Sequence, residues 1–424
     1  MTTAQPFDWI PRQRQLLAAQ DFEQRAPGTI LRDFEALLSL IGEAGLPVTP
    51  AHRFAMSSLE TIDRRLAQPV ELRLKRAPQK SYPPINGLYL LLRATGLGRI
   101  ETQGQQPRLQ LDPFVLASWR SLNATERYFA LLRAWWGRAS AEMIGERRGG
   151  WGETVLQSLL RFFNRFPKTG SLALQTPQDA DLFRYDPGFY NLALLELFGL
   201  FDIHAWPPAE GQGWLPERLR MTEWGQALLG SYADFLGKAL APDPEAELTL
   251  PILGFAAPID PWAGFEAWAK RIRPQLPAWR KDLELPVPVF HPGPHVFKVA
   301  LGAKCWRRIA IPGDADLDQL ATAILDAFHF DRDHWYRFSY RDRFGRTIDI
   351  DHPYRASESE HALADAVKMG ELPLAPGMRL DFWYDFGDEW EFALHAESVP
   401  AELALQKPRV LEKHGQAPKQ YGGG

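Results

Sequence analysis

The sequence predicts a multidomain α+β protein, with a mainly helical N-terminal region that holds two winged-helix-like modules and a C-terminal α+β sheet domain. Three observations lead to this prediction. The first 240 residues contain long segments with apolar residues at helical spacing. Two of these segments end in the same helix–glycine–strand pattern. From residue 296 onward, segments that alternate apolar and polar residues replace most of the helical ones.

Three amphipathic helices are expected in the N-terminal region. Residues 29–46 carry Leu and Ile at helical spacing. Residues 122–139 begin with Asn123, and Glu126 follows three positions later, which is a variant of the capping box. Residues 154–166 repeat the apolar stripe. Helices therefore dominate the first half of the chain.

A repeated pattern marks the end of each module. "LLRATGLGRI" (91–100) and "LLELFGLFDI" (194–203) both read Leu-Leu-x-x-x-Gly-Leu-x-x-Ile. The glycine is typical of a helix C-terminus, and a strand, a polar turn and a second strand follow in both copies. A winged-helix module ends in this way, so the sequence predicts one module over 1–150 and a second over 151–240.

The helices that precede these hairpins are poorly suited to reading DNA. A recognition helix needs polar and basic side chains for the groove, whereas both helices are apolar nearly all round. Such helices are usually buried or dock on another protein surface. Basic residues occur nearby at Arg73, Lys75, Arg76, Lys80, Arg147 and Arg148. A solvated loop is their more common role.

A proline-rich segment follows the two modules. Residues 240–294 hold 11 of the 35 prolines, which predicts an interdomain linker over 241–294. Within it, the sequence "FEAWAKRIR" favours a short helix.

The C-terminal domain, 295–424, is expected to combine a sheet with one main helix. The expected elements are strands at 296–301 and 305–311, a helix at 316–328, a hairpin from 334–340 and 347–352, a short helix at 357–367 and a second hairpin within 378–399. The turn of the second hairpin is "YDFGDEW" (384–390), with acids beside a glycine as turns favour.

Composition narrows the class of protein. The single cysteine, Cys305, excludes an internal disulfide and a cysteine-based zinc site, which favours a reducing cytoplasm. No segment has the length of a membrane span or the apolar core of a leader, so a cytoplasmic protein is expected. The net charge is −4, and residues 295–424 carry 16 Lys and Arg against 21 Asp and Glu. Neither part has the positive excess that favours nucleic acid.

Chemistry-bearing side chains gather in the C-terminal domain, where eight of the ten histidines fall within 291–414. Candidate ligands for a hard cation are His329, Asp331, Asp333, His334, Asp349, Asp351 and His352. Their spacing fits no defined metal loop, and acids that cap turns or keep a strand edge soluble are an equally good interpretation. We predict no cofactor.

The tripeptide Asp385-Phe386-Gly387 also occurs in kinases, where it binds metal. The glycine-rich loop, strand lysine and catalytic loop of a kinase are all missing upstream. The nucleophile elbow, the HExxH motif and the P-loop are missing as well. The sequence therefore carries no enzyme signature.

Several elements of the C-terminal part occur together in one known family. They are "VFKVALGAKCWRRIAIP" (296–312), Leu317, Leu320, Ala327, Phe328, His334, Phe338, "YDFGD" (384–388) with Trp390, and the closing "APKQYGG" (417–423). In these elements residues 295–424 resemble the plasmid pRiA4b ORF-3-like family. The resemblance implies a compact α+β domain and a setting on plasmids or mobile elements, with no activity to transfer. Where relatives tend to have Glu-Asp near the end, this chain has Lys419-Gln420.

The favoured hypothesis is a non-enzymatic interaction protein that binds a protein or nucleic-acid partner and no membrane. Its candidate binding groove comprises Arg307, Arg308, His334, Trp335, Tyr384, Asp385, Asp388 and Trp390. Aromatic side chains beside arginine are typical of binding surfaces. The alternatives are an enzyme or metal-dependent site built from the same His, Asp and Arg side chains for a phosphate-containing substrate, and a DNA-binding regulator of a mobile element.

Overall fold

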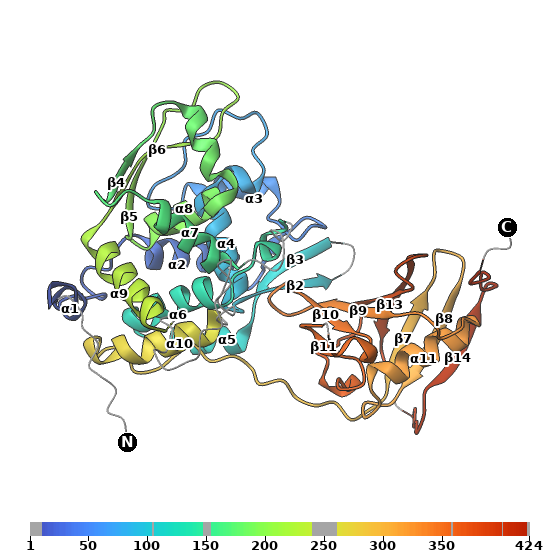
Figure 1. Ribbon diagram of the computed structural model, residues 1–424. Coiled ribbons are helices and arrows are strands. Elements are labelled where there is room, and N and C mark those ends of the chain that lie inside the picture. The colour runs from blue at the N-terminus through green and yellow to red at the C-terminus, as the bar shows by residue number, and fades with distance from the viewer. Residues whose placement is uncertain are drawn as a thin grey trace, which may run out of the picture. The chain divides into compact units, whose positions relative to one another are not determined.

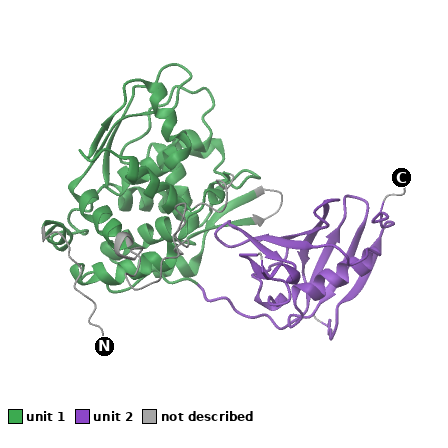
Figure 2. Cartoon of the chain, in the orientation of Figure 1, with its two compact units in different colours: residues 1–285 green, residues 286–424 purple. Residues whose placement is uncertain are grey.

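The computed structural model describes residues 11–103, 106–146, 154–239, 261–357, 359–400 and 402–421. The chain divides into two compact units, unit 1 (Met1–Leu285) and unit 2 (Pro286–Gly424), which Figure 2 colours separately. Together they form a mixed α+β protein, as the sequence predicts.

Unit 1 is mainly helical (Figure 1). Its described helices are α1 (Pro11–Ala18), α2 (Ile30–Ile41), α3 (Met56–Asp63), α4 (Pro83–Ala94), α5 (Pro113–Arg120), α6 (Ala124–Gly137), α7 (Val155–Arg165), α8 (Phe189–Leu197), α9 (Glu223–Ala239) and α10 (Pro261–Ile272). Its described strands are β1 (Leu46–Pro47), β2 (Gly98–Gln103), β3 (Gln106–Leu111), β4 (Ser171–Ala173), β5 (Phe201–Ala205) and β6 (Pro216–Met221).

Two predicted helices of unit 1, α6 and α7, begin directly after side-chain caps. Asn123 accepts a hydrogen bond from Glu126 N, and the Glu126 side chain accepts one from Asn123 N, so α6 opens with a complete capping box. Thr154 and Gln157 cap α7 in the same way. These side chains satisfy amide groups that would otherwise lack a partner in the first turn.

The two halves of unit 1 repeat one topology. Each contains a three-stranded antiparallel sheet, with the orders β1-β3-β2 and β4-β6-β5. In the first half, β1 lies between α2 and α3 in the chain and pairs with β3, the last strand of the hairpin. In the second half, β4 follows α7 and pairs with β6 in the same way. The glycines of the repeated pattern, Gly96 and Gly199, have φ of 75° and 70° and end α4 and α8 as expected.

Helices α4 and α8 form the centre of unit 1. Every residue of α4 is buried, as are seven of the nine residues of α8. They pack closely at Gly87, where an added Cβ would lie 2.8 Å from Leu194 Cγ and 3.1 Å from the Tyr190 carbonyl oxygen. The apolar character of both helices therefore reflects their packing against each other.

The segment after residue 260 belongs to the core of unit 1. In α10 the side chains of Phe265, Trp268 and Ile272 are fully buried, and Trp268 Nε1 donates to Ser231 Oγ at 3.0 Å. Part of the expected 241–294 linker is therefore packed structure, because the apolar face of α10 closes the core. The compact unit ends at Leu285.

Unit 2 is built on one eight-stranded sheet with the order β11-β10-β9-β12-β13-β7-β8-β14. Its elements are β7 (His295–Ala300), β8 (Trp306–Ile311), α11 (Leu317–Phe328), β9 (Tyr336–Arg341), β10 (Thr347–Asp351), β11 (Ala362–Leu363), β12 (Arg379–Tyr384), β13 (Trp390–Glu397) and β14 (Arg409–His414). Asp316 caps α11 in a capping box with Gln319. Both predicted hairpins and the main helix are confirmed.

The two faces of this sheet differ in chemistry. One face packs with α11 in a hydrophobic core that includes Phe297, Phe338 and Phe392. Strand alternation places charged residues on the opposite face, which we call the open face. There, Lys298 lies opposite Arg308 on one side and His395 on the other.

One predicted helix is wrong. Residues 357–367 were expected to be helical, but the described part of this segment forms turns and strand β11. The reason is tertiary: Ala364 N donates to Asp351 O at 2.9 Å, and the Ala364 carbonyl accepts from Leu317 N at 3.0 Å. These bonds hold the segment between β10 and the start of α11. The edge strand β14 was not predicted at all.

Candidate functional site

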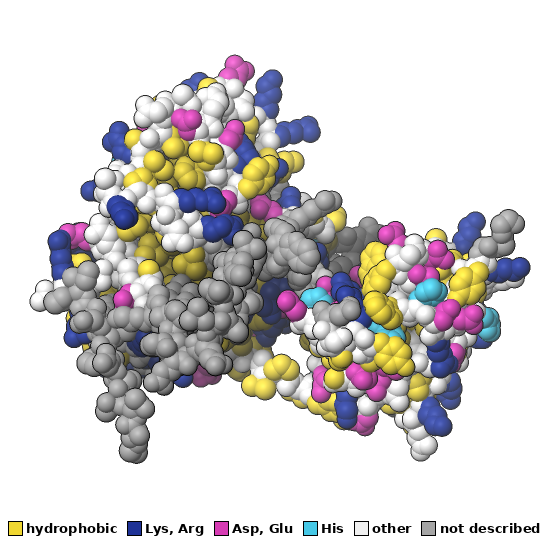
Figure 3. All heavy atoms as spheres, viewed as in Figure 1, with side chains coloured by type: hydrophobic (Ala, Val, Ile, Leu, Met, Phe, Trp, Pro, Cys, Tyr) yellow, Lys and Arg dark blue, Asp and Glu magenta, His cyan; other side chains and the backbone are white. Residues whose placement is uncertain are grey.

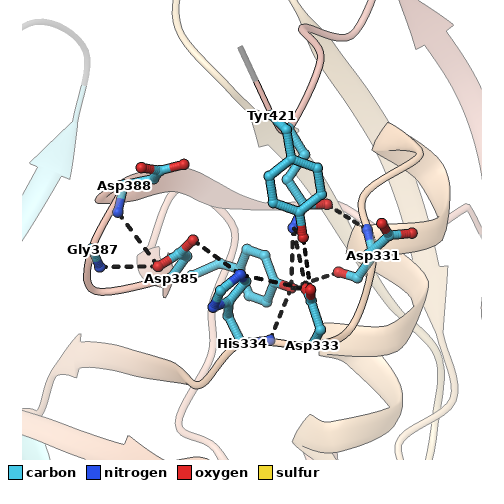
Figure 4. A network of polar contacts seen from close by, with 9 residues as sticks. Asp331, Asp333, His334, Asp385, Gly387, Asp388 and Tyr421 are labelled. Carbon is cyan, nitrogen blue, oxygen red and sulfur yellow. Dashed lines mark hydrogen bonds and ion pairs between the residues drawn. The ribbon is translucent and has the colours of Figure 1, made fainter. Parts of the chain in front are cut away.

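Three separate segments meet at the end of the β12–β13 hairpin in unit 2 (Figure 4). They are the loop after α11, the "YDFGDEW" turn and the C-terminal segment. The residues that join them are Asp331, through its backbone, and the side chains of Asp333, His334, Tyr384, Asp385, Gln420 and Tyr421, which we call the turn-end network.

The turn itself is organised by Asp385. Its Oδ1 accepts hydrogen bonds from Gly387 N at 2.9 Å and Asp388 N at 3.4 Å, and its own amide donates to the Trp335 carbonyl at 3.0 Å. Asp385 has a φ of 56°, which an aspartate in a turn tolerates better than most residues, and Glu389 has a φ of 53°. The Asp388 carboxylate is exposed.

His334 lies between two carboxylates. Its Nε2 is 3.4 Å from Asp385 Oδ2 and 3.6 Å from Asp333 Oδ1. The second oxygen of Asp385 therefore faces the imidazole while the first holds the turn. Two carboxylates around one imidazole can bind a cation or exchange protons with the ring.

The C-terminal segment closes the network from above in the view of Figure 4. Tyr421 donates to Asp333 Oδ2 at 2.7 Å, and this bond lowers the pKa of Asp333 below its ordinary value. Gln420 Oε1 accepts from Asp331 N at 2.5 Å. The buried Tyr384 hydroxyl donates to the Asp331 carbonyl at 2.5 Å. The sequence analysis does not single out Tyr421, although its segment "APKQYGG" is one of the elements that resemble the family.

The candidate groove residues do not all lie together. His334, Trp335, Tyr384 and Asp385 meet at the network, with Asp388 on the same turn. Trp390 begins β13 opposite Tyr384, and its ring packs 5.0 Å from that of Phe330. Trp390 therefore supports the core beneath the network.

Arg307 and Arg308 lie away from the network, on opposite faces of β8. Arg307 is buried and binds backbone carbonyls at the end of α11 and in β14. Arg308 is on the open face, where its Nε donates to Glu397 Oε2 at 2.7 Å and a second nitrogen pairs with Glu412. Consecutive residues of a strand point to opposite faces, so the two arginines cannot share a groove.

The candidate metal ligands are largely engaged by protein groups. No group of three or more His, Cys, Asp or Glu side chains suited to a metal ion occurs among the described residues. His329 caps the end of α11 in a left-handed conformation. Asp349 and Asp351 share the open face as expected, but Arg337 lies between them and bonds Asp351 Oδ1 at 2.6 Å.

Asp351 illustrates how burial and pairing compete. Its burial alone would raise its pKa, but hydrogen bonds from Arg337 and Ser359 and the charges of Arg337 and Arg355 lower it. A carboxyl whose pKa falls on folding stabilises the fold at pH values above its unfolded pKa, about 3.9. That contribution is lost as the pH falls through the lower, folded value.

Replacing Asp351 with asparagine is expected to destabilise unit 2 by about 2 kcal/mol at neutral pH, because Arg337 loses its buried partner. Urea denaturation of wild type and variant from pH 7 down to the acid range measures this. The difference should shrink below about pH 4 as the wild-type carboxylate becomes protonated. An equal difference at every pH would contradict the assignment.

The C-terminal region of the chain matches a known family. Residues 296–424 match the family model of the plasmid pRiA4b ORF-3-like protein. The pRiA4b ORF-3-like region thus runs from β7 to the C-terminus and contains the whole turn-end network. Among solved structures, a protein of unknown function from Methanosarcina mazei Go1 is similar at 20% identity and a TM-score of 0.27, over 31% of this chain and 74% of that one. No curated protein matches the chain.

No described helix has the length and apolarity to cross a membrane.

Proposed function

We propose that this chain is a non-enzymatic interaction protein whose pRiA4b ORF-3-like region binds a protein partner through basic side chains. The binding surface would surround the turn-end network. It comprises the aromatic residues Trp335, Phe386 and Tyr421 with the acids Asp333 and Asp388, and we call it the turn-end surface. A plasmid or mobile-element setting, implied by the family resemblance, is part of this proposal.

The observation that carries the proposal is the exposure of three aromatic side chains at one end of the sheet. Trp335, Phe386 and Tyr421 are 45%, 47% and 49% exposed. Large aromatic groups contribute most to protein interfaces when a partner removes them from water. A fixed turn and a hydrogen-bonded C-terminal segment hold them, so little ordering would be needed on binding.

The charge of this surface favours a basic partner. The Tyr421 hydrogen bond keeps Asp333 ionised, since it lowers the pKa of that carboxyl. The exposed Asp388 carboxylate has no side-chain partner within the described chain. Residues 295–424 carry 16 basic against 21 acidic residues, so the long-range field has the same sign.

We further propose that the halves of unit 1 are winged-helix modules that serve as a scaffold. Their support is the repeated order of helices and strands, with the first strand paired to the last in each sheet. The helix that would enter a DNA groove is α4 in one module and α8 in the other, and both are buried. Their burial argues against DNA reading by these helices and favours a scaffold role for the modules.

The alternative, an enzyme or metal-dependent site for a phosphate-containing substrate, is supported by the position of His334 between Asp333 and Asp385. It lacks cations at the reacting position, since Arg307 binds carbonyls and Arg308 binds glutamates. A phosphate near this network would meet mainly carboxylates, which repel it.

Site-specific photo-crosslinking tests the proposal. A benzophenone amino acid at Phe386, in the full chain, should give a discrete protein adduct in an extract of the source cell. The matched control is Val399, which is 41% exposed and follows the opposite end of β13. Combining Trp335→Ala with Asp388→Asn should reduce the Phe386 adduct at least tenfold, the effect of losing about 1.4 kcal/mol. Equal adducts at both positions, or insensitivity to the two substitutions, would contradict the proposal.

A further inference from the structure

A second feature lies in unit 1, where a cleft separates the two modules. Its volume is about 830 Å³, within the range of roughly 300–1,000 Å³ typical of small-molecule sites. One wall is the start of α4 and the loop that precedes it, and the other is the 177–190 segment with the tip of the β5–β6 hairpin. We infer that this cleft binds a nucleoside phosphate, either as a free nucleotide or within a single-stranded nucleic acid.

The loop between α3 and α4 supplies the positive charge. Lys80 lines the cleft, and Arg73, Lys75 and Arg76 lie on the same loop; all four are exposed, and none forms a salt bridge with another residue of the described chain. Exposed cations without acidic partners attract phosphate more strongly than paired ones. Figure 3 shows Lys and Arg side chains standing out from this end of unit 1.

This basic loop is fixed to the opposite module. Arg73 N donates to Gln212 O at 3.2 Å, and Gly211 N donates to Arg73 O at 2.8 Å. The loop and the hairpin tip are thus joined by backbone hydrogen bonds, like adjacent strands. The two walls of the cleft are therefore held at a set distance, which lowers the entropy cost of binding a ligand between them.

The other charged residues of the cleft are already satisfied. Arg53 Nε donates to Ile144 O at 3.1 Å, and Arg184 pairs with Asp181 at 2.6 Å. The lining acid Glu146 is exposed, and the charges of Arg53 and Lys80 act on it, so Lys80 is partly compensated. Arg73, Lys75 and Arg76 of the same loop supply the remaining positive charge for an anion.

Aromatic side chains give the cleft a place for a base. Tyr185 lines it and is 88% exposed, so its ring is open to stacking. Phe189 and Trp214 pack edge to face with centroids 5.7 Å apart, and they form the adjoining wall. Cations that track phosphates beside rings that stack bases are the shared requirement for nucleotides and for single strands. An acidic peptide would use the cations but not the exposed ring.

The test measures fluorescence anisotropy of the full chain with a fluorescent ATP analogue, a labelled oligo(dT) and a labelled oligo-glutamate peptide. Lys75→Glu combined with Arg76→Glu should weaken nucleotide or oligo(dT) binding tenfold or more, and binding should fall as salt rises. Tyr185→Ala should weaken it about fivefold or more, the usual cost of losing one stacked base. Lys168→Glu, an exposed lysine of the second module outside the cleft, is the matched control and should change binding less than twofold.

Each outcome decides the proposal. Binding of the ATP analogue identifies a free nucleotide as a ligand, and binding of oligo(dT) alone identifies a single strand. No binding of either probe, binding of oligo-glutamate as tight as that of the nucleotides, or full binding by Tyr185→Ala would overturn the inference.

Discussion

Replacing Arg307 with methionine is expected to destabilise unit 2 by about 3 kcal/mol, because it strands several buried carbonyl groups. The guanidinium donates to Ala327 O at 3.0 Å, to Trp306 O and His414 O at 2.9 Å, and to Gly415 O at 3.2 Å. It also lies 4.6 Å from the Phe328 ring centroid. One side chain thereby ties the negative end of α11 to the edge strand β14.

The neighbouring arginine is the matched control. Arg308→Met removes the same charge from the next position of β8, but its pairs with Glu397 and Glu412 are partly exposed and should contribute less than about 1 kcal/mol. Native-state hydrogen exchange of peptides from β8 and β14, followed by mass spectrometry, reports on unit 2 separately from unit 1. Equal loss of protection in the two variants would show that Arg307 has no special structural role.

Replacing Gly199 with alanine should destabilise unit 1 by about 3 kcal/mol or more, since two costs combine. Its φ of 70° is unfavourable for alanine. A Cβ there would also lie 2.5 Å from Gly28 N and 2.7 Å from Pro27 C, which are backbone atoms with little freedom to move. The helix end and the segment before α2 would be forced apart.

Gly211 separates these two costs. It has a φ of 78°, but an added Cβ meets no atom within 4 Å, so Gly211→Ala carries the backbone cost alone, about 1 kcal/mol. Urea denaturation of both variants, followed by circular dichroism of the mainly helical unit 1, measures the difference. If the two substitutions were equally tolerated, the close approach of Gly28 and Gly199 would be refuted.

Local sequence signals predicted most elements, because local interactions create them. Asn123 with Glu126, and Asp316 with Gln319, cap their helices through bonds within four residues. The helix predicted at 357–367 is wrong for the opposite reason. The backbone of Ala364 bonds to Asp351 and Leu317, which lie in other elements of the fold. Strand β14 was missed because its partner β8 lies about a hundred positions earlier in the chain.

In the candidate site, too, the sequence reveals what local interactions create and misses what distant contacts create. Residues 384–388 were identified from the sequence, since a turn rich in acids around a glycine has a recognisable composition. Tyr421 was not, because its hydrogen bond to Asp333 joins residues 88 positions apart. Arg307 and Arg308 were assigned to one groove although the predicted strand at 305–311 already places consecutive side chains on opposite faces.

Local sequence patterns indicated α2, α6, α7 and α11, both hairpins of unit 2 and the resemblance of residues 295–424 to a known family, and they contain no enzyme signature. Helical spacing, caps and turn residues act over a few positions, and each can be read without knowing the fold. The burial of α4 and α8 against each other and the position of His334 between two carboxylates became apparent in the folded structure alone. These arrangements depend on contacts between residues distant in the chain, which a single sequence does not encode locally.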